Sequence, residues 1–183
     1  MTGIDGSGKT TMSRFLAERL GWAVRKVRPF DAATVERDTR IYEAMGAPAS
    51  DAYRACRSAA ALLEDVATLA EPSVFDRYVE SALMWWTVRG ASPLPRPLVE
   101  ALPRPALVIH LDVPVDVGLA RRATTSEHTD AGERLFLERC AAYLRARAEQ
   151  RPGWVTIDAT LPVPDVEEEV LRAGRAVAAG HAA

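Results

Sequence analysis

The chain has 183 residues, of which 48% are hydrophobic and 26% are charged, and its formal net charge at pH 7 is -2. We expect a single domain over residues 1–183, because this length and apolar content suit one core. The near-neutral charge argues against a nucleic-acid partner, and neither a signal-peptide pattern nor an apolar run of membrane-spanning length occurs, so we expect a cytoplasmic protein without membrane contact that binds small molecules.

Short apolar runs alternate along the chain with longer segments of helical periodicity. Strands are predicted over residues 22–27, 73–76, 107–112 and 154–158. Helices are predicted over residues 10–20, 33–45, 51–70, 79–87, 115–122, 133–150 and 166–178. This alternation is typical of an α/β fold with a parallel sheet. Ligands of such sheets bind outside the carboxyl ends of the strands, where we expect Arg28, Asp76, Arg77 and Asp112.

The first helix is preceded by a complete phosphate-binding motif. Gly3-Ile4-Asp5-Gly6-Ser7-Gly8-Lys9-Thr10 fits G-x-x-x-x-G-K-[ST], the P-loop. Its backbone N–H groups converge on phosphate oxygens, Lys9 reaches the β- and γ-phosphates, and the Thr10 hydroxyl holds Mg²⁺. The motif predicts binding of a magnesium nucleoside triphosphate. The residues expected to form this site are Gly3, Asp5, Gly6, Ser7, Gly8, Lys9, Thr10 and Thr11.

Only Met1 and Thr2 precede this loop, although a P-loop normally follows a buried strand in the centre of the sheet. We expect a first strand that is truncated or nearly absent, and we favour a true start upstream of Met1. A trimmed chain and a native two-residue stub are the alternatives. An upstream strand would raise the melting temperature and tighten ATP binding, because an inner strand bonds to two neighbours.

The second strand run delivers Asp76 and Arg77 at its carboxyl end. Asp76 can order Mg²⁺ or its waters, and the Arg77 guanidinium can bind a phosphate with two hydrogen bonds. A surface ion pair is the alternative interpretation. The chain lacks the N-K-x-D motif that binds guanine, which argues against a Ras-like switch. It also lacks an apolar strand that ends in Asp-Glu, which argues against a motor ATPase.

These segments resemble the thymidylate kinase family. Gly3 to Thr11 resembles the P-loop of that family, and Asp76-Arg77-Tyr78 its Asp-Arg-Tyr motif. Further similar segments are Tyr53 to Arg57, Leu111 to Pro114, Arg121-Arg122 and Ile157 to Ala159. The resemblance implies a three-layer P-loop kinase fold with a parallel sheet of order 2-3-1-4-5, a lid near residues 121–134, and a homodimer.

The resemblance also implies an activity, the ATP-dependent phosphorylation of a nucleoside monophosphate, with dTMP or a related pyrimidine monophosphate as acceptor. ATP is then the donor and Mg²⁺ the cofactor. The P-loop contains no arginine, so the lid should supply the positive charge over the donor phosphates. Arg121 or Arg122 would carry this charge, with Arg134 as a second candidate. The catalytic residues are then Lys9, Asp76, Arg77, Arg121 and Arg122, and the metal-binding residues are Thr10 and Asp76.

The acceptor side departs from the family pattern in several places. Phe30 stands two positions away from the usual aromatic residue, and Cys56 replaces a residue that is usually polar. The expected acceptor contacts are Asp5, Arg28, Phe30, Tyr53, Arg57, Arg77 and Trp85. Core packing is the alternative for each aromatic residue, and a turn cap for Asp5. A deoxynucleoside kinase and a non-catalytic nucleotide-binding paralogue are the alternative functions.

Overall fold

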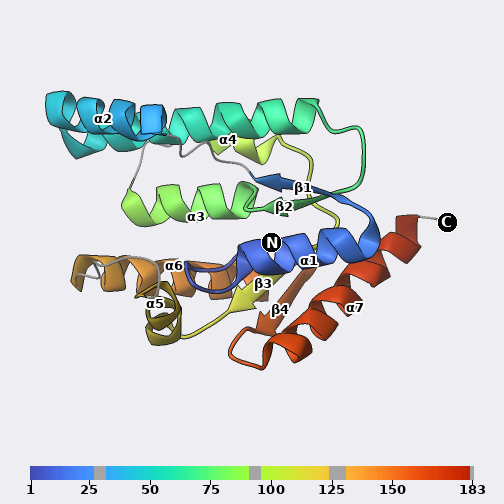
Figure 1. Ribbon diagram of the computed structural model, residues 1–183. Coiled ribbons are helices and arrows are strands. Elements are labelled where there is room, and N and C mark those ends of the chain that lie inside the picture. Colours follow the sequence, from blue (N-terminus) through green and yellow to red (C-terminus); the bar gives the residue numbers. More distant parts are fainter. Residues whose placement is uncertain (27–31, 91–95, 124–130, 182–183) are drawn as a thin grey trace.

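The computed structural model describes residues 1–26, 32–90, 96–123 and 131–181 (Figure 1). The strands within these ranges are β1 (Ala23–Lys26), β2 (Ser73–Asp76), β3 (Val108–Asp112) and β4 (Trp154–Asp158). β1 pairs in parallel with β2, and β3 pairs in parallel with β4. All four predicted strands are present, with ends within one residue of the predicted ones.

The two strand pairs are joined by the first two residues of the chain. The Met1 nitrogen donates to the Phe75 carbonyl at 2.9 Å, and the Arg77 amide donates to the Met1 carbonyl at 3.2 Å. On its other side Thr2 exchanges two backbone hydrogen bonds of 2.8 and 3.0 Å with β3. The order across the sheet is therefore β1, β2, Met1–Thr2, β3, β4. This confirms the predicted 2-3-1-4-5 order, with two residues in the place of the first strand.

Helices cover both faces of this sheet, which gives the three layers that the sequence predicts (Figure 1). α1 packs against α7 on one face, where α1 contacts β1 and β2 and α7 contacts β4. On the other face α6 contacts β3 and β4 and packs against α3, and α2 lies outside α3. The helices are α1 (Lys9–Leu20), α2 (Ala32–Ala67), α3 (Val79–Arg89), α4 (Arg96–Glu100), α5 (Val115–Ala123), α6 (Ala131–Gln150) and α7 (Val163–His181).

The helix predictions hold with one exception. The two helices predicted at 33–45 and 51–70 both lie within α2, which is kinked at Gly46, where the backbone leaves the helical conformation with φ 79° and ψ 178°. Glycine adopts this angle without a Cβ clash, so the chain turns there and resumes as a helix at once. The five-residue helix α4 was not predicted, because it lies in a proline-rich stretch that hides helical periodicity.

The core has two clusters of buried side chains. The larger one surrounds β3, β4 and the start of α1, and includes the fully buried Leu111, Leu144 and Ile157. The smaller one lies between α2, α3 and α4 and includes Trp86, which is 3% exposed. Of the two adjacent tryptophans, Trp86 therefore belongs to the core, whereas Trp85 is only half-buried.

None of the helices in the described ranges is long and apolar enough to span a membrane.

His110 is an ionisable group in the middle of the sheet, on β3, with 1% of its surface exposed. Its ring meets Trp154 edge-on, with the two ring centres 6.1 Å apart, and Nδ1 has no hydrogen-bond partner among the described residues. Burial lowers the pKa of His110 below its usual 6.5; Asp112 opposes this effect and Arg145 adds to it. The imidazole is therefore neutral in the folded protein at neutral pH.

We expect acid to destabilise the fold through His110. As the pH falls below about 6.5, the unfolded chain binds a proton at this imidazole before the folded protein does, so the free energy of unfolding falls with pH. One group contributes at most about 1.4 kcal/mol per pH unit. His110→Leu should flatten this dependence, because leucine does not titrate. Urea unfolding of the wild-type protein and of His110→Leu, at about pH 7.5 and about pH 5.5, measures how the free energy of unfolding depends on pH. An equal pH dependence in the two proteins would exclude His110 as the titrating group.

Candidate functional site

The P-loop connects Thr2 to α1 and is held against α5. Gly6 has a left-handed φ of 82°, and a Cβ added there would lie 2.1 Å from the Gly118 carbonyl oxygen. A Cβ on Gly118 would in turn lie 2.7 Å from the Asp5 carbonyl oxygen. Two glycines therefore let the loop backbone touch the helix backbone. Gly118 was not predicted, because this contact joins distant parts of the chain and has no local motif.

Lys9 begins α1 and is only 6% exposed. Its Nζ donates to the Ile4 carbonyl at 2.6 Å and lies 3.8 Å from the Asp5 carboxylate. Burial lowers the pKa of Lys9 to about 7, with the charge of Arg77 acting in the same direction and Asp5 and Asp76 opposing. An anionic phosphate beside Nζ would stabilise the protonated form. A bound phosphate would therefore raise the pKa of Lys9 and keep its ammonium charged at neutral pH.

Thr10 and Asp76 meet at the carboxyl end of β2. The Thr10 hydroxyl donates to Asp76 Oδ2 at 2.6 Å, and Lys26 Nζ lies 4.0 Å from the same oxygen. Asp76 is buried, and its Oδ1 has no hydrogen-bond partner among the described residues. A hydroxyl and a carboxylate are hard oxygen ligands of the kind that Mg²⁺ takes, together with phosphate oxygens and waters. These two residues fit the predicted Mg²⁺ site.

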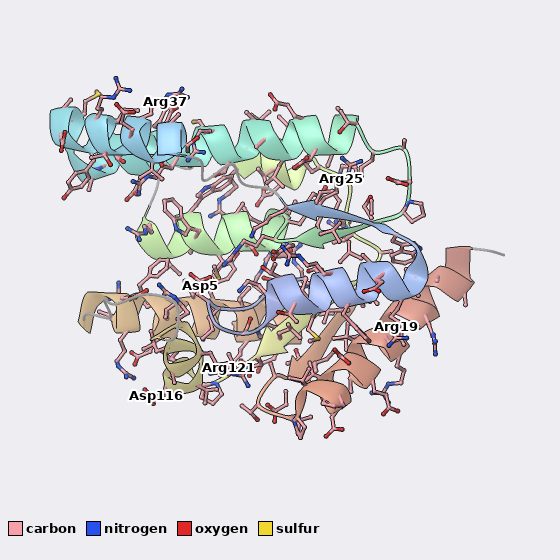
Figure 2. The ribbon with its side chains drawn as sticks, viewed as in Figure 1. Asp5, Arg19, Arg25, Arg37, Asp116 and Arg121 are labelled. Carbon is pink, nitrogen blue, oxygen red and sulfur yellow. The ribbon has the colours of Figure 1, made fainter. Side chains whose placement is uncertain are left out.

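Arg77 directs its guanidinium at the loop. Its φ of 74° makes it the one non-glycine residue with positive φ in the described ranges, and its guanidinium donates to the Asp5 carboxylate. Burial alone would raise the pKa of Asp5, but the charges of Arg77, Lys9 and Arg122 outweigh it and hold the pKa below its usual value. Figure 2 shows Asp5 on the loop before α1. Backbone strain of this kind clusters at active sites and agrees with the predicted role of Arg77.

Two cavities meet at this loop. The first, the P-loop cavity, has a volume of about 470 Å³ and is lined by Asp5, Gly6, Gly8, Lys9, Thr10, Thr11, Lys26, Asp76, Arg77 and Arg122. The second, the α3–α6 cavity, has a volume of about 680 Å³. Its lining includes Gly3, Asp5, Asp51, Arg77, Ser81, Trp85, Arg89, Arg122, Glu133, Phe136 and Cys140. Asp5, Arg77 and Arg122 line both cavities, so ligands in the two would face each other across these residues.

Other predicted site residues lie elsewhere. Arg57, on α2, donates to Asp38 at 3.1 Å, and neither Arg57 nor Tyr53 lines either cavity. Asp38 is 5% exposed, and Arg54 donates to the same oxygen, so two arginines neutralise one buried carboxylate. Asp112 lines neither cavity and accepts from Arg145.

The predicted lid arginines differ in position. Arg122 lines both cavities and donates to Glu133 on α6, whereas Arg121 is exposed and lines neither. Figure 2 shows Arg121 and Asp116 on α5, and Asp116 accepts from Arg134. The expected contacts Arg28 and Phe30 and residues 124–130 of the lid lie outside the described residues.

Arg89 and Phe136 line the α3–α6 cavity but were not predicted. Arg89 follows Trp85 by four positions, a spacing that places both residues on one helix face. That spacing was visible in the sequence. Phe136 comes from α6, and no sequence pattern connects it to α3.

Comparison with known proteins agrees with this arrangement. A model of the thymidylate kinase family matches residues 1–170. The thymidylate kinase of Thermomicrobium roseum is 33% identical over 202 residues, which cover 94% of this chain and 95% of that protein. That of Xanthomonas campestris pv. campestris (strain B100) is 32% identical over 194 residues, which cover 96% of this chain and 79% of that protein.

Among solved structures, a deoxyadenosine kinase from M. mycoides with the products dCMP and a flexible dCDP bound is similar to the chain, with a TM-score of 0.72. The sequence identity is 16%, and the match covers 96% of this chain and 97% of that chain. At this identity the likeness establishes the fold alone.

Proposed function

The chain belongs to the thymidylate kinase family of nucleoside-monophosphate kinases, and on that premise we propose that it transfers the γ-phosphoryl group of ATP to a pyrimidine nucleoside monophosphate, with dTMP as the first candidate. The observation that supports this proposal best is the boundary between the two cavities. Asp5, Arg77 and Arg122 line both, so a triphosphate in the P-loop cavity and a monophosphate in the α3–α6 cavity would place their phosphates in contact.

The P-loop side would bind the donor. The amides of the loop and the start of α1 would hold phosphate oxygens, and Lys9 would exchange its contact with the Ile4 carbonyl for one with the transferred group. Thr10 and Asp76 would hold Mg²⁺ at the bound triphosphate. When bound, this ion neutralises negative charge on the phosphates.

The acceptor side needs orientation and charge rather than a general base. A monophosphate is largely dianionic at neutral pH, because its second pKa is about 6, so its oxygen is already a nucleophile. Arg77 can bind that phosphate with two hydrogen bonds, and Arg122 can approach the transferred group from α5. In the absence of substrate, Arg77 contacts the Asp5 carboxylate and Arg122 contacts the Glu133 carboxylate. A bound phosphate would either displace these carboxylates or bind beside them.

A deoxynucleoside kinase is the less favoured alternative, because a sugar hydroxyl needs a carboxylate that accepts its proton. Glu80 is 8% exposed and is bound by Arg147 and Arg151, and it does not line the α3–α6 cavity. Asp5 has a lowered pKa, held down chiefly by Arg77 against the effect of burial, which makes it a weak base. These contacts favour a monophosphate as the acceptor.

Incubation with ATP, Mg²⁺ and a panel of pyrimidine nucleosides and their monophosphates tests this function. We expect diphosphate formation, fastest with dTMP, and no phosphorylation of nucleosides. Phosphorylation of nucleosides alone would contradict the monophosphate kinase, and ATP binding without turnover of any acceptor would indicate a non-catalytic nucleotide-binding protein. A cytoplasmic location and a homodimer remain part of this proposal.

A further inference from the structure

Asp51 is a half-buried residue of α2 whose carboxylate lines the α3–α6 cavity. Its oxygens make no hydrogen bond and no ion pair with any of the residues that the structure describes. The other carboxylates that line this cavity are both paired. Asp5 accepts from Arg77, and Glu133 accepts from Arg122. Within the described part of the lining, Asp51 is therefore the carboxylate whose hydrogen bonds are left to water or to a ligand.

The direction of α2 places Asp51 at the end of the cavity away from Arg77. The second part of α2 runs alongside α3 in the opposite direction (Figure 1). Ser58 of α2 shares a small cavity with Arg77, Ser81 and Trp85, and so lies beside the first turns of α3. Asp51 precedes Ser58 by seven residues, which is two turns and about 10 Å on the same helix face. It therefore lies beside the last turns of α3.

This position determines which part of an acceptor Asp51 would meet. On the basis of the proposed function, the acceptor phosphate binds at Arg77 and the base extends along α3 toward Asp51. An ionised carboxylate accepts hydrogen bonds and donates none, so the base must present an N–H donor. Cytosine has an amino group at position 4, whereas thymine has an acceptor oxygen there. The N3–H of thymine lies between two carbonyl oxygens, which would repel the carboxylate. Cytosine thus suits Asp51 better than thymine does.

We propose that Asp51 accepts a hydrogen bond from the 4-amino group of cytosine, and that dCMP is therefore a second acceptor of this protein beside dTMP. The transfer is the same with either acceptor. An oxygen of the dCMP phosphate forms a bond to the γ-phosphorus of ATP, the bond from that phosphorus to the bridging oxygen breaks, and its electron pair leaves with ADP. The products are dCDP and ADP. A hydrogen bond to an ionised carboxylate is about twice as strong as one between neutral groups, which favours this contact.

Steady-state kinetics with dCMP and dTMP, for the wild-type protein, Asp51→Leu and Asp51→Asn, test this inference. We expect the wild-type protein to phosphorylate both monophosphates. Leucine has no acceptor, so Asp51→Leu should lower kcat/KM for dCMP about tenfold or more, chiefly through KM, and should leave kcat/KM for dTMP unchanged or higher. Asparagine keeps an acceptor oxygen without the charge, so Asp51→Asn should retain part of the activity with dCMP.

Asp65→Leu is the matched control. Asp65 is a half-buried aspartate on the same helix, but it lines neither cavity. This variant should leave the rates with dCMP and dTMP unchanged. A wild-type protein that phosphorylates dTMP but not dCMP would overturn the inference. An equal loss with both substrates in Asp51→Leu would also overturn it, because a packing role rather than a contact with the amino group would then explain the effect.

Failure of the proposed function would give a different result, because the wild-type protein would then phosphorylate no monophosphate. Calorimetric titration with dCMP and with dTMP, in the absence of ATP, tests the contact of Asp51 in that case too. Weaker binding of dCMP but not of dTMP by Asp51→Leu would support the contact with the amino group. Equal affinities of the wild-type protein and the variant for dCMP would refute it.

Discussion

Lys9→Ala is expected to lower kcat/KM for phosphoryl transfer by about 10³-fold, the largest effect of any single substitution considered. The lysine is the buried cation of the loop, and its Nζ lies 2.6 Å from the Ile4 carbonyl, so the loop already positions it to meet developing charge on the transferred group. Initial rates over a range of ATP and acceptor concentrations measure the loss. A variant that retains more than about a tenth of the wild-type rate would show that Lys9 has no such role, because tenfold corresponds to only about 1.4 kcal/mol.

The fold should tolerate this substitution. Burial already disfavours the charged form of Lys9, as its pKa of about 7 shows, so removal of the ammonium should leave the melting temperature unchanged or slightly raised. Arg14→Ala is the control, because Arg14 is an exposed cation on the same helix and lines neither cavity. It should leave both the rate and the melting temperature unchanged.

Arg77→Ala is expected to raise the KM for the monophosphate and to lower kcat, with a combined loss of about 10²-fold in kcat/KM. The guanidinium lies at the boundary of the two cavities and would fix the attacking phosphate oxygen. ATP binding, measured by titration, should change little. If the affinities for ATP and for the monophosphate fall equally, Arg77 contacts the donor rather than the acceptor.

Arg77→Gly separates the side chain from its backbone. At φ 74° a glycine is unstrained, whereas alanine retains the Cβ clash, so Arg77→Gly should be more stable than Arg77→Ala by about 1 kcal/mol. Both variants should lose the same activity, because both lack the guanidinium. Chemical unfolding compares their stabilities, and equal values would show that the left-handed backbone stores no strain.

Most of the fold could be predicted because its signals are local. The strands are short apolar runs, and the P-loop is a complete motif, so β2, β3, β4 and α1 appear within one residue of their predicted bounds. The sheet order followed from the family resemblance, and backbone hydrogen bonds of Met1 and Thr2 confirm it. The short helix α4 lacks the length at which periodicity can be recognised.

The acceptor side was harder to predict because its contacts join distant residues. The turn at Gly46 brings Asp38 next to Arg57, and the two form an ion pair. The sequence had predicted that Arg57 contacts the base of the acceptor nucleotide. Phe136 reaches Arg89 only through the packing of α6 on α3. A single sequence contains no signal for such pairs, so the roles of Arg57 and Tyr53 remain predictions.

One titration tests most directly whether the two cavities hold donor and acceptor end to end. The ligand is adenosine joined to thymidine through a polyphosphate chain, which spans both cavities only if they meet at Asp5, Arg77 and Arg122. We predict that one equivalent per chain displaces both ATP and dTMP and binds more tightly than either, because the second half binds intramolecularly. Displacement of only one of the two nucleotides, or affinity no greater than that of ATP alone, would contradict the shared phosphate boundary and with it the proposed transfer.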